Sequence, residues 1–133
     1  MSNSIELMKR LETFYLTLTL TVYHERGVIY LNQKNYLMAI KNFDEVLKIE
    51  PENKKTHFER ARAYASLEKF DEAIRDNSKA IDLDSKFISA YINRGISYRK
   101  VKKYKESLKD SNEAIKLMKN PAIAYLQRGE TYR

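Results

Sequence analysis

The sequence repeats itself every 34 residues, and this period limits the possible folds more than any other feature. One column of the repeat is aromatic and a second is small: Tyr30, Tyr64, Tyr98 and Tyr132; Gly27, Ala61, Gly95 and Gly129. A third column holds Tyr23, His57, Tyr91 and Tyr125. The shared period divides the chain into units at 20–53, 54–87 and 88–121, with a partial fourth unit at 122–133 and a separate N-terminal segment at 1–19. We expect the chain to be part of a longer protein, because the fourth unit stops after one helix.

Apolar residues within each unit have helical spacing. Tyr91, Gly95, Tyr98 and Val101 follow one another at intervals of four, three and three, which places them on one helix face. The second half of that unit shows a second such face. With only three glycines and two prolines in 133 residues, the composition also favours helices over a turn-rich β fold. Each unit is therefore predicted to be an antiparallel helical hairpin, and the fold class to be all-α.

The small column sits in the middle of the first helices, where glycine costs up to about 1 kcal/mol relative to alanine. A cost that recurs needs a recurring reason. We expect the second helix of each hairpin to approach closely there, with Ala39, Ala73 or Ser107 facing the small residue.

The columns together resemble the tetratricopeptide repeat (TPR) over residues 20–133. The resemblance rests on the aromatic and small columns above and on three further sets of positions: the aromatics Tyr36, Phe70 and Tyr104; the residues Ala39, Ala73 and Ser107; and the boundary prolines Pro51 and Pro121. The resemblance implies a right-handed α-solenoid whose first helices line a concave groove. The chain departs from the pattern in three ways. Asn77 and Ser111 stand in the column of Phe43, and Ser85 replaces a boundary proline. The turn residues Lys34, Glu68 and Lys102 are not glycine.

Residue constellations typical of catalysis are missing from the sequence. It has no cysteine, only two histidines, and no glycine-rich phosphate loop, nucleophile elbow or paired histidine motif. His57 stands in an aromatic column and is interpreted as a packing residue. We therefore expect no enzyme activity, no cofactor and no metal site.

By the resemblance, the first-helix residues that the packing columns leave over face the groove. They combine apolar side chains with arginines, an arrangement suited to a peptide with hydrophobic anchors and an acidic group. The predicted peptide-binding residues are His24, Val28, Leu31, Phe58, Arg62, Ile92, Asn93, Ile96, Arg99 and Leu126. We expect Phe58→Ala to weaken binding with little loss of stability. The alternative is that a neighbouring segment or subunit covers part of this surface.

Some TPR relatives clamp the C-terminal carboxylate of chaperones with lysine and asparagine, then asparagine, then lysine and arginine on three successive first helices. The corresponding residues here are His24, Val28, Glu59, Ser89 and Asn93, or, one unit later, Phe58, Arg62, Asn93, Ile123 and Gln127. Only Asn93 in the second register matches. The expected protein or peptide partner is therefore not held by such a clamp within this chain.

Most of the net charge of +7 comes from the third unit, which has nine basic and three acidic residues. Its inter-helix turn carries Lys100, Lys102, Lys103 and Lys105. This cluster suits a nucleic acid or an acidic protein partner, but a local basic run is a weak signal and a solvated charged turn is the favoured interpretation. A nucleic-acid function is the less favoured interpretation.

The N-terminal segment shows two competing periods. Met8, Leu11, Tyr15, Leu18 and Val22 follow a helical spacing, whereas residues 14–22 also alternate as a strand would. We favour the helix because no glycine or proline breaks the run. Residues 5–22 are expected either to cap the array or to mediate self-association. No apolar run is long enough to cross a membrane, and we expect a cytoplasmic protein, with the nucleus as an alternative.

Overall fold

The computed structural model describes residues 2–120 and residue 122, and within them every regular element is an α-helix. This confirms the predicted all-α class, and the continuous first helix confirms helix rather than strand at 14–22. The helices are α1 Ser2–Asn32, α2 Tyr36–Ile49, α3 Lys54–Ser66, α4 Phe70–Leu83, α5 Ile88–Lys100 and α6 Tyr104–Lys119. Expectations for Leu126 and for the other fourth-unit positions beyond 122 lie outside the described residues.

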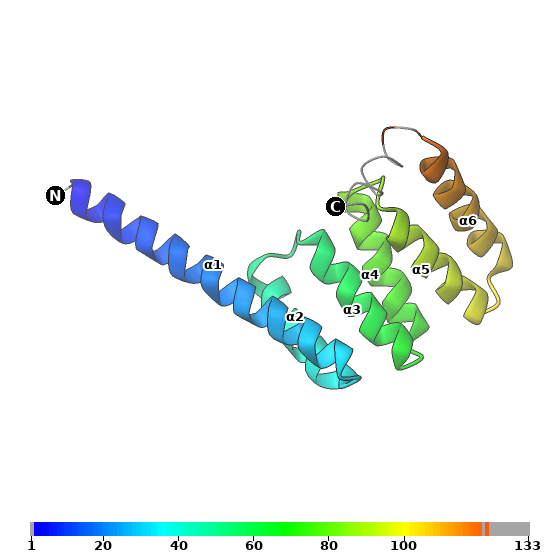
Figure 1. Ribbon diagram of the computed structural model, residues 1–133, viewed down its shortest axis with the longest axis horizontal. Helices are drawn as coiled ribbons and strands as arrows, with labels where there is room; N and C mark the ends of the chain where they lie inside the picture. Colours follow the sequence, from blue (N-terminus) through cyan, green and yellow to red (C-terminus); the bar gives the residue numbers. More distant parts are fainter. Residues whose placement is uncertain (1, 121, 123–133) are drawn as a thin grey trace.

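Three helical hairpins stand side by side in a row (Figure 1). They pair the second half of α1 with α2, α3 with α4, and α5 with α6. Each hairpin turns through a residue in the left-handed region, with φ of 62° at Lys34, 61° at Glu68 and 65° at Lys102. The next amide then donates back to the tyrosine carbonyl five residues earlier, as Lys103 does to Tyr98 at 2.8 Å. This hydrogen bond ends the first helix of each hairpin. The left-handed residue just before the donor is the position at which glycine would be free of strain.

The hydrophobic core lies between hairpins as well as within them. One cluster joins Leu31, Ala39, Ile40 and Phe43 of the first unit to Ala63 of the second. The other cluster joins the second unit to the third through Ala80, Ile81, Ile88, Ala90, Tyr91 and Ala114. Because each cluster draws residues from two units, the hairpins stabilise one another as a solenoid. Leu31 is only 6% exposed, so it is a core residue and not the groove residue that the sequence predicted.

The two described glycines lie at close helix contacts, for different reasons. A Cβ added at Gly27 would lie 2.5 Å from the ring of Phe43, so a side chain there is excluded by this aromatic and not by Ala39, as we had expected. A Cβ added at Gly95 would meet Ser107 O and the Cβ of Asp110 at 3.4 Å, an ordinary contact. In this contact between α5 and α6, the hydroxyl of Ser107 also donates to the carbonyl of Gly95 at 2.7 Å.

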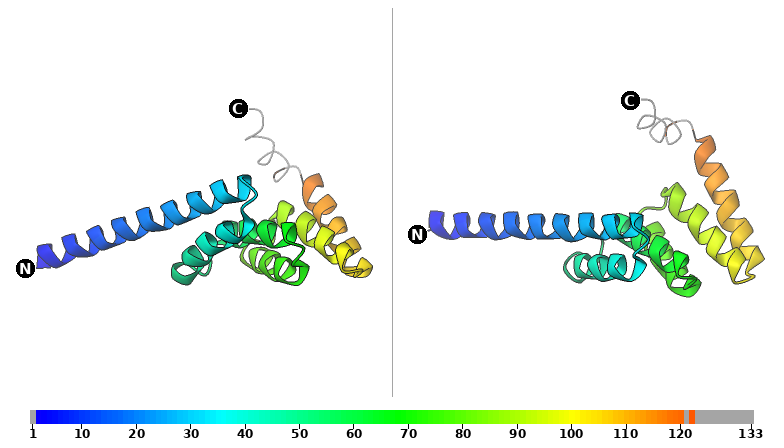
Figure 2. Two further views of the ribbon diagram at one scale, coloured as in Figure 1. Left: turned by 90° about the horizontal axis from the view of Figure 1, so that it is seen from below. Right: turned by 60° about the horizontal axis from the view of Figure 1, so that its bottom comes forward.

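The first half of α1 projects from the array as a straight helix (Figures 1 and 2). Residues 3–19 are all exposed, and α1 runs unbroken through the boundary expected between residues 19 and 20. This segment therefore extends the first helix and covers neither end of the array. Among the described residues, no helix is both long and apolar enough to cross a membrane.

The two glycines predict opposite effects of the same substitution. Gly27→Ala should lower the free energy of unfolding by about 1–3 kcal/mol, because the fully buried ring of Phe43 has no space into which to move. Gly95→Ala should be neutral or stabilising by up to about 1 kcal/mol, because alanine is the better helix former and the space is sufficient. Urea unfolding followed by circular dichroism measures both. Equal destabilisation by the two variants would contradict this account of the contacts.

Candidate functional site

A cavity of about 390 Å³ opens between α3 and α5, with α4 beneath it. Its walls are formed by the C-terminal halves of the two first helices. The lining residues are Ala61, Arg62, Ala65, Ser66, Glu68, Phe70, Asn77, Asn93, Ile96, Ser97 and Lys100. Small side chains on α3 make room for the cavity, while two cations and one exposed isoleucine stand at its edge.

The floor of the cavity lies where an aromatic ring is missing. Asn77 occupies the same column as Phe43, whose ring fills the space above Gly27 in the first unit. The shorter Asn77 leaves that space open above Ala61. Its side chain is 1% exposed, and its Oδ1 atom is buried with no hydrogen-bond partner among the described residues. A buried acceptor of this kind costs about 1–3 kcal/mol when unsatisfied, and because solvent does not reach this atom, a ligand in the cavity would contact it only after the side chain moved.

The structure brings together part of the predicted groove set. Arg62, Asn93 and Ile96 line the cavity. Ile92 and Arg99 are exposed on the same helix, α5, outside the cavity lining. These two helices therefore supply one continuous surface of mixed apolar and basic side chains.

Other predicted residues are engaged in packing. Phe58 stacks on Phe87 with ring centroids 4.9 Å apart and packs against the second core cluster. Phe58→Ala is therefore expected to reduce stability, contrary to the expectation from sequence, and it cannot serve as a clean test of binding. Val28 packs against the first core cluster.

His24 lies against the next hairpin and does not reach the cavity. Its Nδ1 atom is 3.1 Å from the hydroxyl of Thr56, and its ring lies 5.8 Å from that of Phe43. Burial lowers the pKa of His24, and the nearby charge of Lys55 lowers it further. His24 is therefore a neutral interhelical contact around neutral pH.

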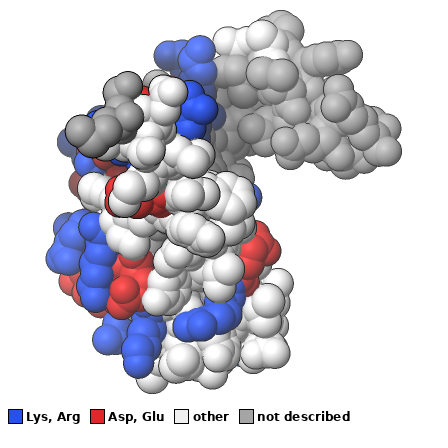
Figure 3. All heavy atoms as spheres, turned by 90° about the vertical axis from the view of Figure 1, so that its left-hand side faces the viewer, with Lys and Arg blue, Asp and Glu red and all other residues white. Residues whose placement is uncertain are grey.

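The basic cluster at 99–105 does not converge on one surface. Lys100 lines the cavity between α3 and α5, whereas Lys105 lines a separate hollow on the outer side of α6. Lys102 and Lys103 lie on the turn between them. Acidic and basic side chains are also interspersed on the face seen from the N-terminal side (Figure 3). Binding of nucleic acid or acidic protein by this cluster stays a prediction.

Among the described residues, no group of three or more potential ligand side chains is placed to hold a metal ion.

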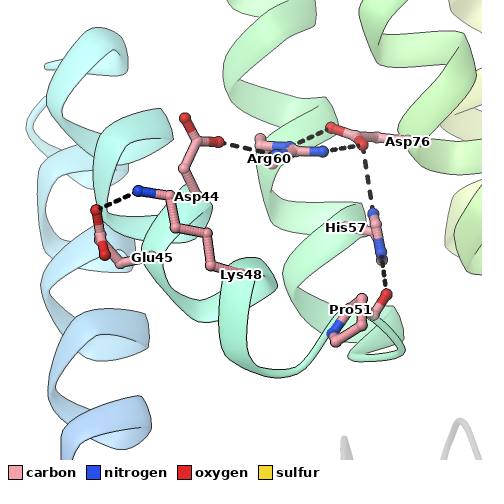
Figure 4. A network of polar contacts seen from close by, with 7 residues as sticks. All are labelled: Asp44, Glu45, Lys48, Pro51, His57, Arg60 and Asp76. Atoms are coloured by element: carbon pink, nitrogen blue, oxygen red, sulfur yellow. Dashed lines mark hydrogen bonds and ion pairs between the residues drawn. The ribbon is translucent and has the colours of Figure 1, made fainter.

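A column of arginines that the sequence reasoning overlooked joins the hairpins. Arg60 donates from Nε and Nη2 to Asp76 at 2.7 Å, and from Nη1 to Asp44 at 2.8 Å (Figure 4). Asp76 belongs to the same hairpin as Arg60, but Asp44 belongs to the preceding one. Arg94 repeats the arrangement 34 residues later, with two bonds to Asp110 and one to Ser78. The 34-residue spacing of Arg26, Arg60 and Arg94 was the signal that could have revealed this column.

His57 completes the network around Asp76. Its Nε2 atom donates to the carbonyl of Pro51 at 2.8 Å, and its Nδ1 atom lies 3.3 Å from Asp76 (Figure 4). Burial opposes ionisation of Asp76, but the hydrogen bonds from Arg60 and His57 outweigh it, and the pKa of Asp76 is lowered. His57 is buried in its column, as its interpretation as a packing residue requires, but it also ties the turn before α3 to α4.

The stacked hairpins and their groove define a helical-repeat protein of the kind that binds other proteins. Residues 21–53, 55–87 and 88–121 each match the family model of the tetratricopeptide repeat. The chain belongs to the tetratricopeptide repeat family, and it is a protein-interaction module.

Solved TPR domains have the same fold. The first TPR of Spaghetti (RPAP3), bound to the HSP90 peptide SRMEEVD, is 28% identical with a TM-score of 0.74, over 85% of this chain and 90% of that one. The yeast Sti1 TPR2B domain in complex with an Hsp70 peptide is 28% identical with a TM-score of 0.76, over 84% and 90%. The Arabidopsis OM64 TPR domain is 27% identical with a TM-score of 0.73, over 84% and 92%. No curated protein matches the chain in sequence.

Breaking the buried pair should destabilise the protein far more than breaking an exposed one. Asp76→Ala leaves Arg60 without its main partner in a site where the aspartate side chain is 5% exposed, and should cost about 3–5 kcal/mol. Glu45→Ala removes the exposed pair with Lys48 and should cost less than about 1 kcal/mol. Urea unfolding at neutral pH compares the two variants.

The same pair predicts a pH dependence. Because the folded-state pKa of Asp76 is lowered, its contribution to stability is present above the unfolded pKa near 3.8 and is lost as the pH falls through the folded value. The stability difference between wild type and Asp76→Ala should therefore shrink below about pH 4. A difference that stays constant in acid would show that ionised Asp76 does not stabilise the fold.

Proposed function

We propose that the chain binds an extended segment of a partner protein in the cavity between α3 and α5. The observation that carries this proposal is the cavity of about 390 Å³ between two first helices of a TPR array, lined by Asn93, Ile96 and Lys100. An extended peptide presents backbone N–H and C=O groups along its length, and these groups need hydrogen-bond partners when they are covered. The side-chain amide of Asn93 on the α5 wall can donate to or accept from the peptide backbone.

The walls favour a particular ligand chemistry. Ile96 is 44% exposed beside the cavity and Ile92 is 40% exposed one turn earlier, so both offer area to an apolar anchor. Lys100 lines the cavity and suits an acidic side chain on the same segment, whereas Arg62, which also lines it, is paired with Glu59 at 2.9 Å. The proposed ligand is therefore a peptide with an apolar anchor flanked by an acidic residue.

A free C-terminal carboxylate is not the proposed anchor. Glu59, at one position of the chaperone clamp, pairs with Arg62 at 2.9 Å and would repel a second carboxylate. Ser89 and Asn93 stand where that clamp has lysine and arginine. The first TPR of Spaghetti (RPAP3) binds the HSP90 peptide SRMEEVD, but the recognition proposed here uses internal side chains of the partner.

Peptide selection on a phage library tests the proposal. Selected peptides should combine an apolar residue with aspartate or glutamate, and synthetic copies should bind the wild type in fluorescence anisotropy. Ile96→Asp should weaken this binding at least about tenfold, because it introduces a charge at the apolar anchor site. Arg62→Glu should weaken it further for the more acidic peptides. Leu37→Asp, at a residue 68% exposed on α2, is the matched control and should bind as the wild type does.

The peptide SRMEEVD serves as a second probe in the same assay. It should bind the chain more weakly than the selected peptides do, and amidation of its C-terminus should change little. Selected peptides that tolerate Ile96→Asp would exclude the cavity as the site. A strong loss of affinity on amidation of SRMEEVD would show instead that the chain clamps a terminal carboxylate.

A further inference from the structure

The outward side of α1 carries an exposed apolar stripe that the groove does not explain. At 3.6 residues per turn, the stripe lies on one side of the helix from residue 7 to residue 22. It contains no charged residue in that range, and it comprises Leu7, Met8, Leu11, Phe14, Tyr15, Leu18 and Val22, all exposed. Gly27 and Leu31, which face the array, lie on the opposite side of the helix and are buried. The stripe therefore faces away from the hairpins and has no cover among the described residues.

The same side of α1 corresponds to an interface that the other units bury. Val22 and Ile29 occupy the columns of Thr56 and Ala63, which are fully buried where α3 meets the first hairpin. Ala90 and Ser97 fill these columns in α5 and are equally buried. In α1, by contrast, Val22 is 56% and Ile29 is 53% exposed. The first unit thus presents a hairpin-stacking surface with larger apolar side chains than the other two, and nothing is stacked on it.

The arginine column shows the same open position. Arg60 and Arg94 each reach an acceptor on the second helix of the preceding hairpin, Asp44 or Ser78. Arg26 donates from Nε to Asn42 at 2.9 Å within its own hairpin and has no second side-chain acceptor among the described residues. The exposed apolar columns and the open arginine position therefore both indicate that a helix is missing from the outward side of α1.

The residues that would supply this helix continue α1 instead. Residues 2–15 stand 34 positions before α2 Tyr36–Ile49, so in the repeat they correspond to a preceding second helix. They lie in the projecting half of α1, which cannot fold back onto its own continuation without a break. Residues 3–19 also contain three threonines, a phenylalanine and a tyrosine, which are poor helix formers, so the helicity of the projecting half depends on packing.

We propose that a second copy of this chain covers the stripe, with the two α1 helices paired antiparallel. In the register that sets Leu11 against Val22 of the partner subunit, Tyr15 meets the partner's Leu18. The two-fold axis then passes between this pair and its symmetry-related copy. Each projecting half then lies on the outward side of the other copy's first hairpin. It runs in the direction of a preceding second helix, because successive helices of the repeat are antiparallel.

The chemistry of the projecting half favours a protein partner over a lipid surface. Glu6 and Glu12 balance Lys9 and Arg10, so the segment has no net charge to attract anionic lipid. The hydroxyls of Thr19 and Thr21, which flank the stripe, already donate to helix carbonyls four residues earlier at 2.8 and 2.9 Å. Covering them leaves no donor unsatisfied.

Light scattering coupled to size exclusion tests the dimer on the full 133-residue chain. The wild type should have twice the mass of 15.7 kDa, and Leu18→Asp should be a monomer, because the charge falls beside the two-fold axis. Leu37→Asp on α2 is the matched control and should remain a dimer. Circular dichroism should show that Leu18→Asp keeps the repeat array and loses helix signal from the projecting half. A monomeric wild type, or a dimeric Leu18→Asp, would overturn the proposal.

Disulfide trapping tests the orientation, because the chain contains no cysteine of its own. The double variant Leu11→Cys with Val22→Cys should form a covalent dimer under mild oxidation, and neither single variant should do so. Cross-linking by each single variant would indicate parallel helices and refute the antiparallel pairing. Flotation of a monomeric wild type with vesicles of phosphatidylcholine and phosphatidylserine would assign the stripe to a membrane surface and equally refute the dimer.

Discussion

The interaction on which the array depends is one arginine held between two hairpins. Arg60 makes a bidentate pair with Asp76 in its own hairpin and a third bond to Asp44 in the preceding one. A guanidinium group can do this because its donors point in fixed directions within one plane. The three bonds set the distance between neighbouring second helices and the angle at which the first helix lies between them. Arg94 repeats the geometry with Asp110 and Ser78, so the stacking is copied from unit to unit.

This polar column compensates for a core that becomes poorer along the chain. The large buried ring of Phe43 is replaced by Asn77 in the second unit and by the exposed Ser111 in the third. Alanine dominates the remaining buried column positions, so the apolar area per hairpin is small. Substituting asparagine for the aromatic residue also opens the cavity between α3 and α5. The loss of packing and the origin of the proposed binding site are thus one and the same change.

Much of the fold could be predicted from the period alone. Tyr30, Tyr64 and Tyr98, with the small column beside them, placed every hairpin and its phase, because only a helical hairpin buries residues with that spacing. The site was harder to predict, because which side of a first helix faces the groove depends on how hairpins stack. Leu31 and Phe58 were assigned to the groove by family analogy, but they are drawn into interhelical contacts by their immediate neighbours.

The arginine column has the same 34-residue period in the sequence, but charged residues on helices are usually solvated, so the spacing alone does not predict interhelical ion pairs. Its acceptors lie sixteen positions away, on the other helix of the hairpin, a separation that a search for pairs within one helix does not cover. The cavity floor escaped prediction for a related reason. A single asparagine in an aromatic column reads as a weakened repeat, and only the coordinates show that its oxygen is left without a partner.

The repeat interface also explains why the first helix differs from the other two. At the columns that face the preceding unit, α3 and α5 carry threonine, alanine and serine, which allow a neighbouring hairpin to approach closely. In α1 the same columns carry valine and isoleucine, and the apolar stripe continues past the end of the array. Larger side chains suit a single helix that packs at a greater distance, as helices do in a coiled coil, rather than a hairpin at close contact. A surface that elsewhere extends the array by one unit is thereby converted, at the first unit, into one that accepts a lone helix.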